Sequence, residues 1–461
     1  MRQTVKYFSI IIVVFLLLNI YACSTNDANG QDESFSINAD DFDMTVPENS
    51  NGDNNPDDGE SSGTANENNG SKDNKSALSQ NDAKKANLDS SNSPGSTYYF
   101  DDEEFKPMEI PSRKNAYKLF NTYNKMKNGE AVKVVYFGGS VTRGHGASNE
   151  DKYSWRALTT AYLKSLSSGT VEEINVAEGG TGSYFGASRF EYDVSSKNPD
   201  LVFIEFLVND GYSGLSAEQS QANLEYMINT LYAKNPYTDV VLVLVTNTTI
   251  YGRQTSLYNA QVGIANYYNI PIVDFGGELY NKFEGSLGLF NENFNDSVHP
   301  NDKGYKLYAD IMADALKELL VSAPVAAHKK PAKALAKNGF STLANIQAST
   351  FKDSKWDVNP WLNSKNNNYH ALYPKCLGPK NTNATLKVNF TGNTFGFIGT
   401  VKTDCTLTFV VDGSGKKIIQ GSSANKIEYP LFDNLANTEH TVTVTVAGNT
   451  DAEIAAFVTT K

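Results

Sequence analysis

The stretch AVKVVYF at residues 131–137, followed by Gly138-Gly139-Ser140, decides the fold class. Its β-branched and aromatic residues form a nearly continuous apolar run that ends at a glycine turn, which is typical of a strand buried on both faces. Three further runs have this character: LVFIEFLV at 201–208, VVLVLVT at 240–246 and IPIVDF at 270–275. The sequence therefore indicates a sheet that is covered on both sides.

Helical patterns separate these runs, at residues 155–166, 216–234 and 258–268. Strands that alternate with amphipathic helices form a parallel sheet with helices on both faces. We therefore expect a three-layer α/β/α domain over residues 98–322.

Residues with chemical potential gather where the predicted strands end. In an open parallel sheet the ligand crevice lies beyond the carboxyl ends of the strands. Such residues follow the predicted strands at 131–137 and 201–208 and a short run at 173–177, or precede a last predicted helix at 302–320: Ser140, Gly180, Asn209, Asp296 and His299. One crevice is expected to collect them all.

Four blocks of sequence in this region resemble the ordered blocks of the SGNH (GDSL-like) hydrolases. They are GGSVT at 138–142, NVAEGGTGS at 175–183, EFLVND at 205–210 and DSVHP at 296–300. The resemblance implies a serine esterase, similar to the carbohydrate esterases of that family. Ala177 and Leu207 stand where the family commonly has glycine. Neither departure removes a hydrogen-bond donor, but both leave the substrate open.

The resemblance implies that Ser140 is the nucleophile, His299 the general base and acid, and Asp296 the carboxylate that orients His299. A serine hydroxyl is a poor nucleophile and needs such a base, itself held by a third group. Taken alone, Ser140 would suit a turn. Asp296 alone would suit a helix cap, although Asn301 and Asp302 are nearer to the predicted helix.

An oxyanion hole is implied by the same resemblance. Its donors would be the backbone N–H groups of Ser140 and Gly180 and the side-chain amide of Asn209, aimed at the charge of a tetrahedral intermediate. Gly179 is the alternative to Gly180, and Asn209 alone would also suit the turn after a strand. No cofactor and no metal is implied.

Three other polar residues have open roles. His145, in a glycine-rich loop five residues after Ser140, either shapes the pocket or is simply exposed. Arg189 and Glu205 are candidates for a buried charge pair near the site, with a purely structural role as the alternative.

The N-terminal region predicts export. Residues 1–22 form a signal peptide, with a basic start and an apolar run shorter than the ~20 residues of a spanning helix. The tetrapeptide IYAC at 20–23 resembles a bacterial lipobox, which implies lipidation of Cys23; a cleaved secretory signal before an incidental cysteine is the alternative. Residues 23–97 are too polar to pack and predict a disordered tether. We expect an extracytoplasmic protein, anchored by lipid to the bacterial cell membrane.

A second domain is expected after a linker at 323–339. From residue 340 to 461 short alternating strand patterns, separated by turns such as Asp412-Gly413, predict an all-β sandwich. The run NTFGFIGTV at 393–401 resembles jelly-roll, galactose-binding-like modules of some carbohydrate esterases. Trp356, Trp361 and Tyr369 are candidates for a sugar-stacking platform or for the core.

Charge and cysteine content narrow the choice of partners. A formal net charge of −12 argues against nucleic acid and against a polybasic grip on anionic lipid. Cys376 and Cys405 could pair in an exported protein, but the sequence does not decide whether they form a disulfide.

The function that we expect is removal of O-acyl groups, above all O-acetyl, from extracellular or cell-wall polysaccharide. The alternatives are a lysophospholipase or thioesterase of the same fold and a non-catalytic carbohydrate-binding surface lipoprotein. No obligate protein partner is inferred.

Overall fold

The computed structural model describes residues 105–460 with gaps at 338, 352, 362–370 and 424–425. The expected signal peptide, Cys23 and tether lie outside these residues, as does Tyr369. The described residues all fall within one compact unit.

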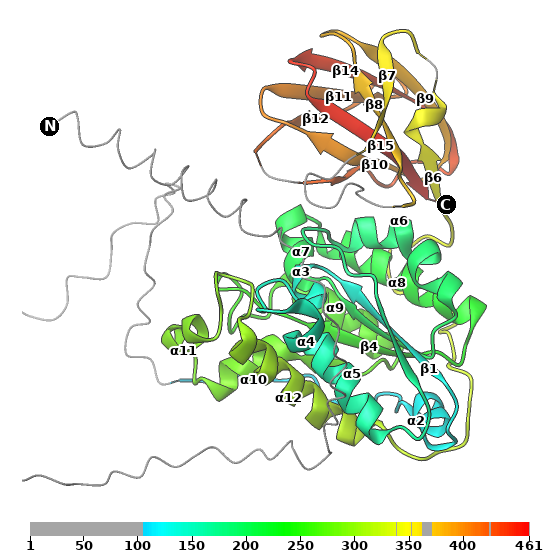
Figure 1. Ribbon diagram of the computed structural model, residues 1–461. Coiled ribbons are helices and arrows are strands. Elements are labelled where there is room, and N and C mark those ends of the chain that lie inside the picture. Colours follow the sequence, from blue (N-terminus) through cyan, green and yellow to red (C-terminus); the bar gives the residue numbers. More distant parts are fainter. Residues whose placement is uncertain (1–104, 338, 352, 362–370, 424–425, 461) are drawn as a thin grey trace, which may run out of the picture. The chain divides into compact units, whose positions relative to one another are not determined.

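A parallel five-stranded sheet forms the centre of the first domain, in the order β2-β1-β3-β4-β5 (Figure 1). Its strands are β1 (Val132–Gly138), β2 (Val171–Asn175), β3 (Leu201–Glu205), β4 (Asp239–Leu244) and β5 (Ile272–Asp274). Every residue of β3 and β4 is buried, as expected for strands with both faces covered. The predicted α/β class is confirmed.

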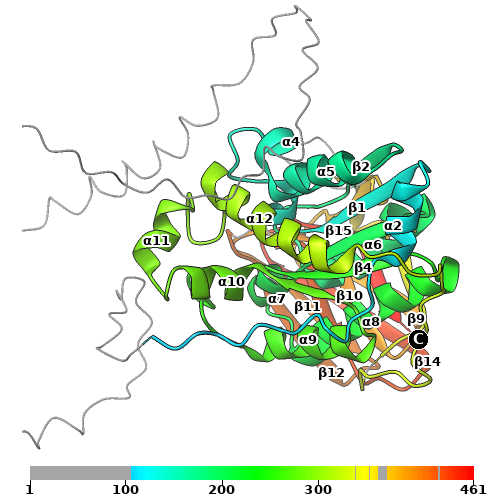
Figure 2. The ribbon, with the colours of Figure 1, turned by 90° about the horizontal axis from the view of Figure 1, so that it is seen from below.

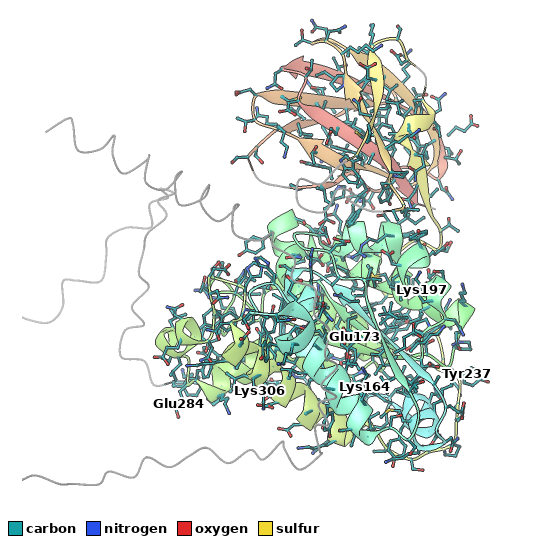
Figure 3. The ribbon with its side chains drawn as sticks, in the orientation of Figure 1. Lys164, Glu173, Lys197, Tyr237, Glu284 and Lys306 are labelled. Carbon is teal, nitrogen blue, oxygen red and sulfur yellow. The ribbon has the colours of Figure 1, made fainter. Side chains whose placement is uncertain are left out.

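Side chains of β1 alternate between two layers of helices. Tyr136 contacts Trp155 of α5, with ring centroids 5.4 Å apart, whereas Phe137 packs on Phe190 of α6. Figure 2 shows α5 and α12 on one side of the sheet and α8 and α9 on the other. Charged side chains such as Lys164 and Lys306 cover the outer surfaces of α5 and α12 (Figure 3).

The helices of this domain are α2 (Phe120–Lys127), α3 (Ser140–Arg143), α4 (Glu150–Tyr153), α5 (Trp155–Leu166), α6 (Ser183–Asp193), α7 (Leu207–Ser213), α8 (Ala217–Lys234), α9 (Ser256–Tyr267), α10 (Phe275–Lys282), α11 (Leu287–Glu292) and α12 (Asp302–Leu319), with a 3₁₀ turn η2 (Ser195–Lys197). Side-chain caps start the long ones: Ser216 forms a capping box with Gln219 before α8, and Asn301 caps α12. Within residues 105–460, no helix combines the length and the apolar character that crossing a bilayer requires.

Two of the predicted strands run into helices in the structure. The run 201–208 leaves the sheet after Glu205, and Leu207 and Val208 begin α7 instead. The run 270–275 forms a strand only at 272–274, and Phe275 begins α10. An apolar run alone does not distinguish a buried strand from a buried helical turn, so these boundaries were predicted wrongly.

Two antiparallel sheets make up the C-terminal domain. One contains β6 (Leu343–Gln347), β7 (Trp356–Pro360), β8 (Lys375–Pro379), β10 (Thr394–Val401), β13 (Glu428–Phe432) and β15 (Ala452–Thr460); the other contains β9 (Thr385–Gly392), β11 (Cys405–Val411), β12 (Gly415–Gln420) and β14 (Thr438–Gly448), and a 3₁₀ turn η3 (Ala348–Thr350) follows β6. Alternate residues of β9 and β14 are buried, which is the period of a strand with one covered face. The predicted all-β second domain is confirmed.

Four residues of this domain whose roles were open are buried in the structure. Trp356 and Trp361 are buried, with 4% and 0% of their surface exposed. Trp356 packs in the sandwich core and Trp361 in a buried cluster that also includes Phe185, so neither forms a stacking platform. Cys376 and Cys405 are buried free thiols and form no disulfide with each other.

The segment between the two domains packs along the first one. Ala326 N donates to Asn121 Oδ1 at 3.2 Å, and the His328 ring lies 2.8 Å from the carboxylate of Asp239. Farther on, Ala336 N donates to the Glu225 carboxylate at 2.9 Å. The linker is therefore held at several points by side chains of the first domain.

Candidate active site

Ser140 is the first residue of α3, directly after β1 and the pair Gly138-Gly139. Neither glycine has room for a side chain. A Cβ on Gly138 would lie 2.6 Å from the carbonyl oxygen of Glu205, and one on Gly139 would overlap the side-chain amide of Asn209. The turn is thus pressed between the ends of neighbouring strands, which fixes the position of Ser140.

Ser140, His299 and Asp296 form a continuous chain of hydrogen bonds. Ser140 Oγ lies 2.8 Å from His299 Nε2, and His299 Nδ1 lies 2.7 Å from Asp296 Oδ2. The structure therefore brings together the three residues that the sequence suggested as nucleophile, base and orienting carboxylate. This is the arrangement in which a serine hydroxyl can lose its proton to imidazole.

The loop that carries Asp296 and His299 is held by its own backbone. Asp296 Oδ1 accepts the N–H groups of Val298 and His299, both at 2.8 Å, and Asn295 N donates to the carbonyl of His299. Burial raises the pKa of Asp296, but the hydrogen bonds from the His299 ring and from these backbone groups outweigh it and leave the pKa below its ordinary value. Since Asn301 caps α12, Asp296 is free of the capping role.

The oxyanion-hole candidates lie around Ser140. Gly180 adopts φ +75°, which favours glycine, and a Cβ on Gly179 would lie 3.5 Å from the Cβ of Ser140. Asn209 is buried and donates one amide N–H to the carbonyl of Thr181 at 2.8 Å. Its amide has a second N–H, which is the group available to a ligand.

Glu205 supports the nucleophile turn. Its buried carboxylate accepts Thr142 Oγ1 at 2.8 Å and Gly139 N at 3.3 Å. Burial raises its pKa, while these hydrogen bonds act in the opposite direction. Arg189 instead pairs with Asp193 at 2.8 Å, so the suggested pair of Arg189 with Glu205 does not form and both residues have structural roles.

His145 lies beside the catalytic histidine candidate. Its ring centroid is 4.6 Å from that of His299, at an interplanar angle of 80°, and its side chain is about half exposed. Both suggested roles therefore remain: it borders the site, and solvent reaches it.

Two residues near the site were missed in the sequence. Tyr212, on α7, is 61% exposed, and its hydroxyl accepts a hydrogen bond from Asn247 Nδ2 at 3.2 Å. Asn247 is the second missed residue. The residue after it, Thr248, donates its N–H to the carbonyl of Ser297, which lies between Asp296 and His299 in the sequence. The signal that pointed to Asn209, a polar residue just after a buried strand, applies equally to Asn247.

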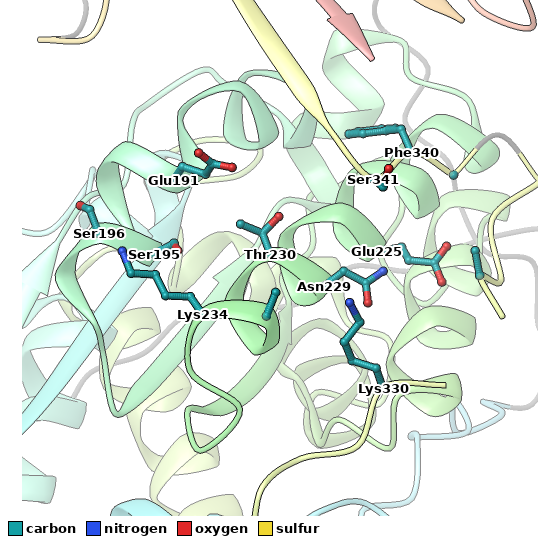
Figure 4. A pocket seen from close by; sticks show the side chains of 13 residues that line it. Glu191, Ser195, Ser196, Glu225, Asn229, Thr230, Lys234, Lys330, Phe340 and Ser341 are labelled. Carbon is teal, nitrogen blue, oxygen red and sulfur yellow. The ribbon is translucent and has the colours of Figure 1, made fainter. Parts of the chain in front are cut away.

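A cavity lies elsewhere in the described part of the chain. It has a volume of about 920 Å³ and is lined by Glu191, Glu225 and Lys234 of α6 and α8 and by Lys330 and Phe340 from the segment after α12, among others (Figure 4). It includes none of Ser140, Asp296 and His299. The catalytic candidates are therefore not in this cavity.

A parallel α/β/α sheet with a Ser–His–Asp chain of hydrogen bonds beyond its strand ends defines a serine hydrolase. Residues 136–307 match the model of the GDSL-like Lipase/Acylhydrolase family. This match marks a GDSL-like lipase/acylhydrolase domain in the chain and, together with the Ser–His–Asp arrangement, supports a carboxylic ester hydrolase.

Two solved structures of one two-domain esterase share the fold. A two-domain esterase active on acetylated mannans has a TM-score of 0.63 and 20% identity, covering 76% of this chain and 98% of that chain. Its co-crystal with mannopentaose gives a TM-score of 0.62 at 20% identity, with coverages of 75% and 96%. A catalytic mutant of an acetylxylan esterase from Geobacillus stearothermophilus has a TM-score of 0.36 and 18% identity, covering 42% of this chain and 97% of its own. A search of curated proteins finds no match.

Proposed function

We propose that the protein is an exported esterase that removes O-acetyl groups from polysaccharide, with Ser140, His299 and Asp296 as its catalytic residues. The observation that carries the proposal is the unbroken chain of hydrogen bonds from Ser140 Oγ through His299 to Asp296. Ser140 Oγ and His299 Nε2 are close enough for direct proton transfer, and Asp296 is close enough to orient the His299 ring.

The reaction follows from these contacts. His299 Nε2 takes the hydroxyl proton as Ser140 Oγ bonds to the ester carbonyl carbon, whose oxygen becomes negative. The N–H groups of Ser140 and Gly180 and the amide of Asn209 stabilise that oxygen. As the C–O bond to the sugar breaks, His299 returns the proton to the leaving sugar oxygen, which becomes a hydroxyl. Water, deprotonated by His299, then cleaves the acyl-serine, releases acetate and restores Ser140.

A sugar substrate is supported by the surroundings of the site. Tyr212 presents an exposed aromatic ring on α7, the helix that also carries Asn209, and aromatic rings offer apolar faces on which sugar rings pack. The two-domain neighbour acts on acetylated mannans and shares both domains of the fold. These features favour a polysaccharide ester over a long-chain lipid.

The experiment is acetate release from acetylated mannan, xylan and peptidoglycan by the purified protein and by Ser140→Ala. We expect release by the wild type and loss of at least about three orders of magnitude in the variant. Ser196→Ala, an exposed serine on a 3₁₀ turn, is the matched control. If no polymer releases acetate and octanoyl esters are cleaved faster than acetyl esters, the polysaccharide proposal is wrong and a lipid ester is the substrate.

Export and lipid anchoring are part of the proposal. They depend on residues 1–22 and on Cys23, which lie outside the described residues. The test is fractionation of cells that express the full chain: the wild type is expected in the membrane fraction with a lipidated Cys23, and Cys23→Ala in the soluble fraction. Equal partitioning of both would contradict the anchor.

A further inference from the structure

Glu428 is a buried carboxylate in β13 of the C-terminal domain whose hydrogen-bond donors belong to the catalytic domain. It is 1% exposed. Its Oε2 accepts Phe185 N at 2.8 Å, and its Oε1 accepts Ser213 Oγ at 2.6 Å and also Gly182 N. A buried charge is tolerated where several donors surround it, and three donors do so here.

These donors lie on the two elements that carry the oxyanion-hole candidates. Gly182 is two residues after Gly180 and is the N-cap of α6, whose first turn contains Phe185. Ser213 is the last residue of α7, which carries Asn209. A negative charge at the start of an 11-residue helix also interacts favourably with its dipole.

A second carboxylate completes the arrangement from inside the catalytic domain. Asp210, next to Asn209, accepts Ser183 N at 2.6 Å. Gly182 passes between the two acids: a Cβ there would lie 2.8 Å from Asp210 Oδ1 and 2.9 Å from Glu428 Oε1. The backbone between Gly180 and α6 is thus fixed from both sides.

A lysine of the same C-terminal segment adds another tie. Lys426 Nζ donates to the carbonyl of Ser213 at 2.7 Å. Two residues of one short segment therefore contact the end of α7, and one of them also holds the start of α6.

We propose that Glu428 is a positioning residue of the oxyanion hole, so that the C-terminal domain is a working part of the hydrolase site. The inference rests on the proposed function, because it assigns Gly180 and Asn209 as oxyanion donors. Donors stabilise a transition state to the extent that they are fixed before the reaction. Glu428 fixes the elements that carry two of them without touching the substrate itself.

The test compares Glu428→Gln with the wild type in the full chain, using p-nitrophenyl acetate. The amide keeps the size of the side chain but places an NH₂ group against backbone donors. We expect kcat to fall about 10- to 100-fold with KM changed less than twofold, since misplaced donors affect the transition state and not substrate binding. Glu453→Gln is the matched control: Glu453 lies in β15 of the same sheet and contacts Thr400.

Amide hydrogen exchange at Gly182 and Phe185 provides a readout that does not depend on activity. Exchange at both is expected to be faster in Glu428→Gln and unchanged in Glu453→Gln. If Glu428→Gln does not fold, Ser213→Ala, which removes one of the three donors, is expected to lower kcat in the same direction. A folded Glu428→Gln with kcat within twofold of the wild type, or with unchanged exchange, overturns the proposal. A wild type that cleaves no ester overturns the proposed function instead, and exchange alone then decides whether Glu428 holds α6.

Discussion

Gly139 and Asn209 lie so close that a side chain on the glycine would displace the amide of the asparagine, with a Cβ 3.0 Å from Asn209 Cγ and closer still to its nitrogen. Gly139 directly follows β1, and Asn209 lies on α7, the helix that follows the neighbouring strand β3. The turn that carries the proposed nucleophile and the proposed oxyanion donor are therefore in direct contact.

Gly139→Ala is expected to lower kcat about 10²- to 10³-fold, the loss typical of removing one oxyanion donor. Gly139 has φ −94°, which alanine also adopts, so the effect comes from the contact and not from the backbone. Steady-state kinetics on an acetyl ester check it. Gly211→Ala, on α7, is the control and should retain activity, because a Cβ added there would lie 3.8 Å from Leu257 Cδ1, an ordinary contact distance. Equal kinetics for Gly139→Ala and the wild type would contradict the assignment of Asn209.

Asp296→Asn is expected to lower kcat by about 10²- to 10⁴-fold while the fold is retained, because an amide favours the wrong tautomer of His299. The pKa of Asp296 is below its ordinary value, so the wild-type carboxylate stays ionised to a lower pH than an ordinary aspartate does. Activity measured from pH 4 to 9 in both proteins checks this. Asp302→Asn, which perturbs only a contact with Ser148, should leave kcat unchanged.

Tyr212→Ala is expected to raise KM for acetylated polysaccharide about 2- to 10-fold, the effect of losing one aromatic contact. Cleavage of p-nitrophenyl acetate should hardly change, since a small ester does not reach the ring. Tyr237→Ala is the control: Tyr237 is 48% exposed and precedes β4, at the amino edge of the sheet (Figure 3). A KM for polymer that is unaffected by Tyr212→Ala would remove this residue from the substrate site.

Asp210 links stability to pH. Burial raises its pKa to about 7, with a smaller contribution from the charge of Glu428, and hydrogen bonds from Ser183 and Ser220 oppose the rise. In the unfolded chain its pKa is about 3.9. The folded chain therefore binds an extra proton between these values, and the associated stability is complete below about pH 4 and is lost as the pH rises through 7.

Asp210→Asn removes this dependence. The melting temperature of the wild type minus that of Asp210→Asn should decrease from pH 4 to pH 7.5. Thermal melts at half-unit steps check it, with Asp274→Asn as a comparison, because burial also raises the pKa of Asp274, to about 6. Parallel curves for wild type and Asp210→Asn would contradict the assignment.

Much of the fold could be predicted from short-range patterns. The run at 131–137 and its three counterparts gave parallel strands because residues buried on both faces must be apolar. The ends of the runs at 201–208 and 270–275 could not be predicted, since Leu207 and Phe275 are as apolar in a helix as in a strand. The sequence blocks brought out Ser140, Asp296 and His299 as candidates, and the structure places them within hydrogen-bond distance.

What the sequence could not provide was contact between distant segments. Tyr212 follows no pattern, because an exposed aromatic residue on a helix signals nothing until its surroundings are known. Glu428 lies in a strand whose sequence pattern is that of any β-sandwich strand. Its hydrogen-bond donors precede it by more than two hundred residues. Only the folded chain shows that they meet.

The sequence separation of 246 between Gly182 and Glu428 also bears on the order of assembly. Ribosomes release a chain from its N-terminus, and domains fold as they emerge. A chain that has been synthesised only as far as α12 already contains Ser140 and His299, but nothing yet holds α6 from outside. Full activity would then arise only when synthesis is almost complete, which delays hydrolysis until the whole molecule has formed.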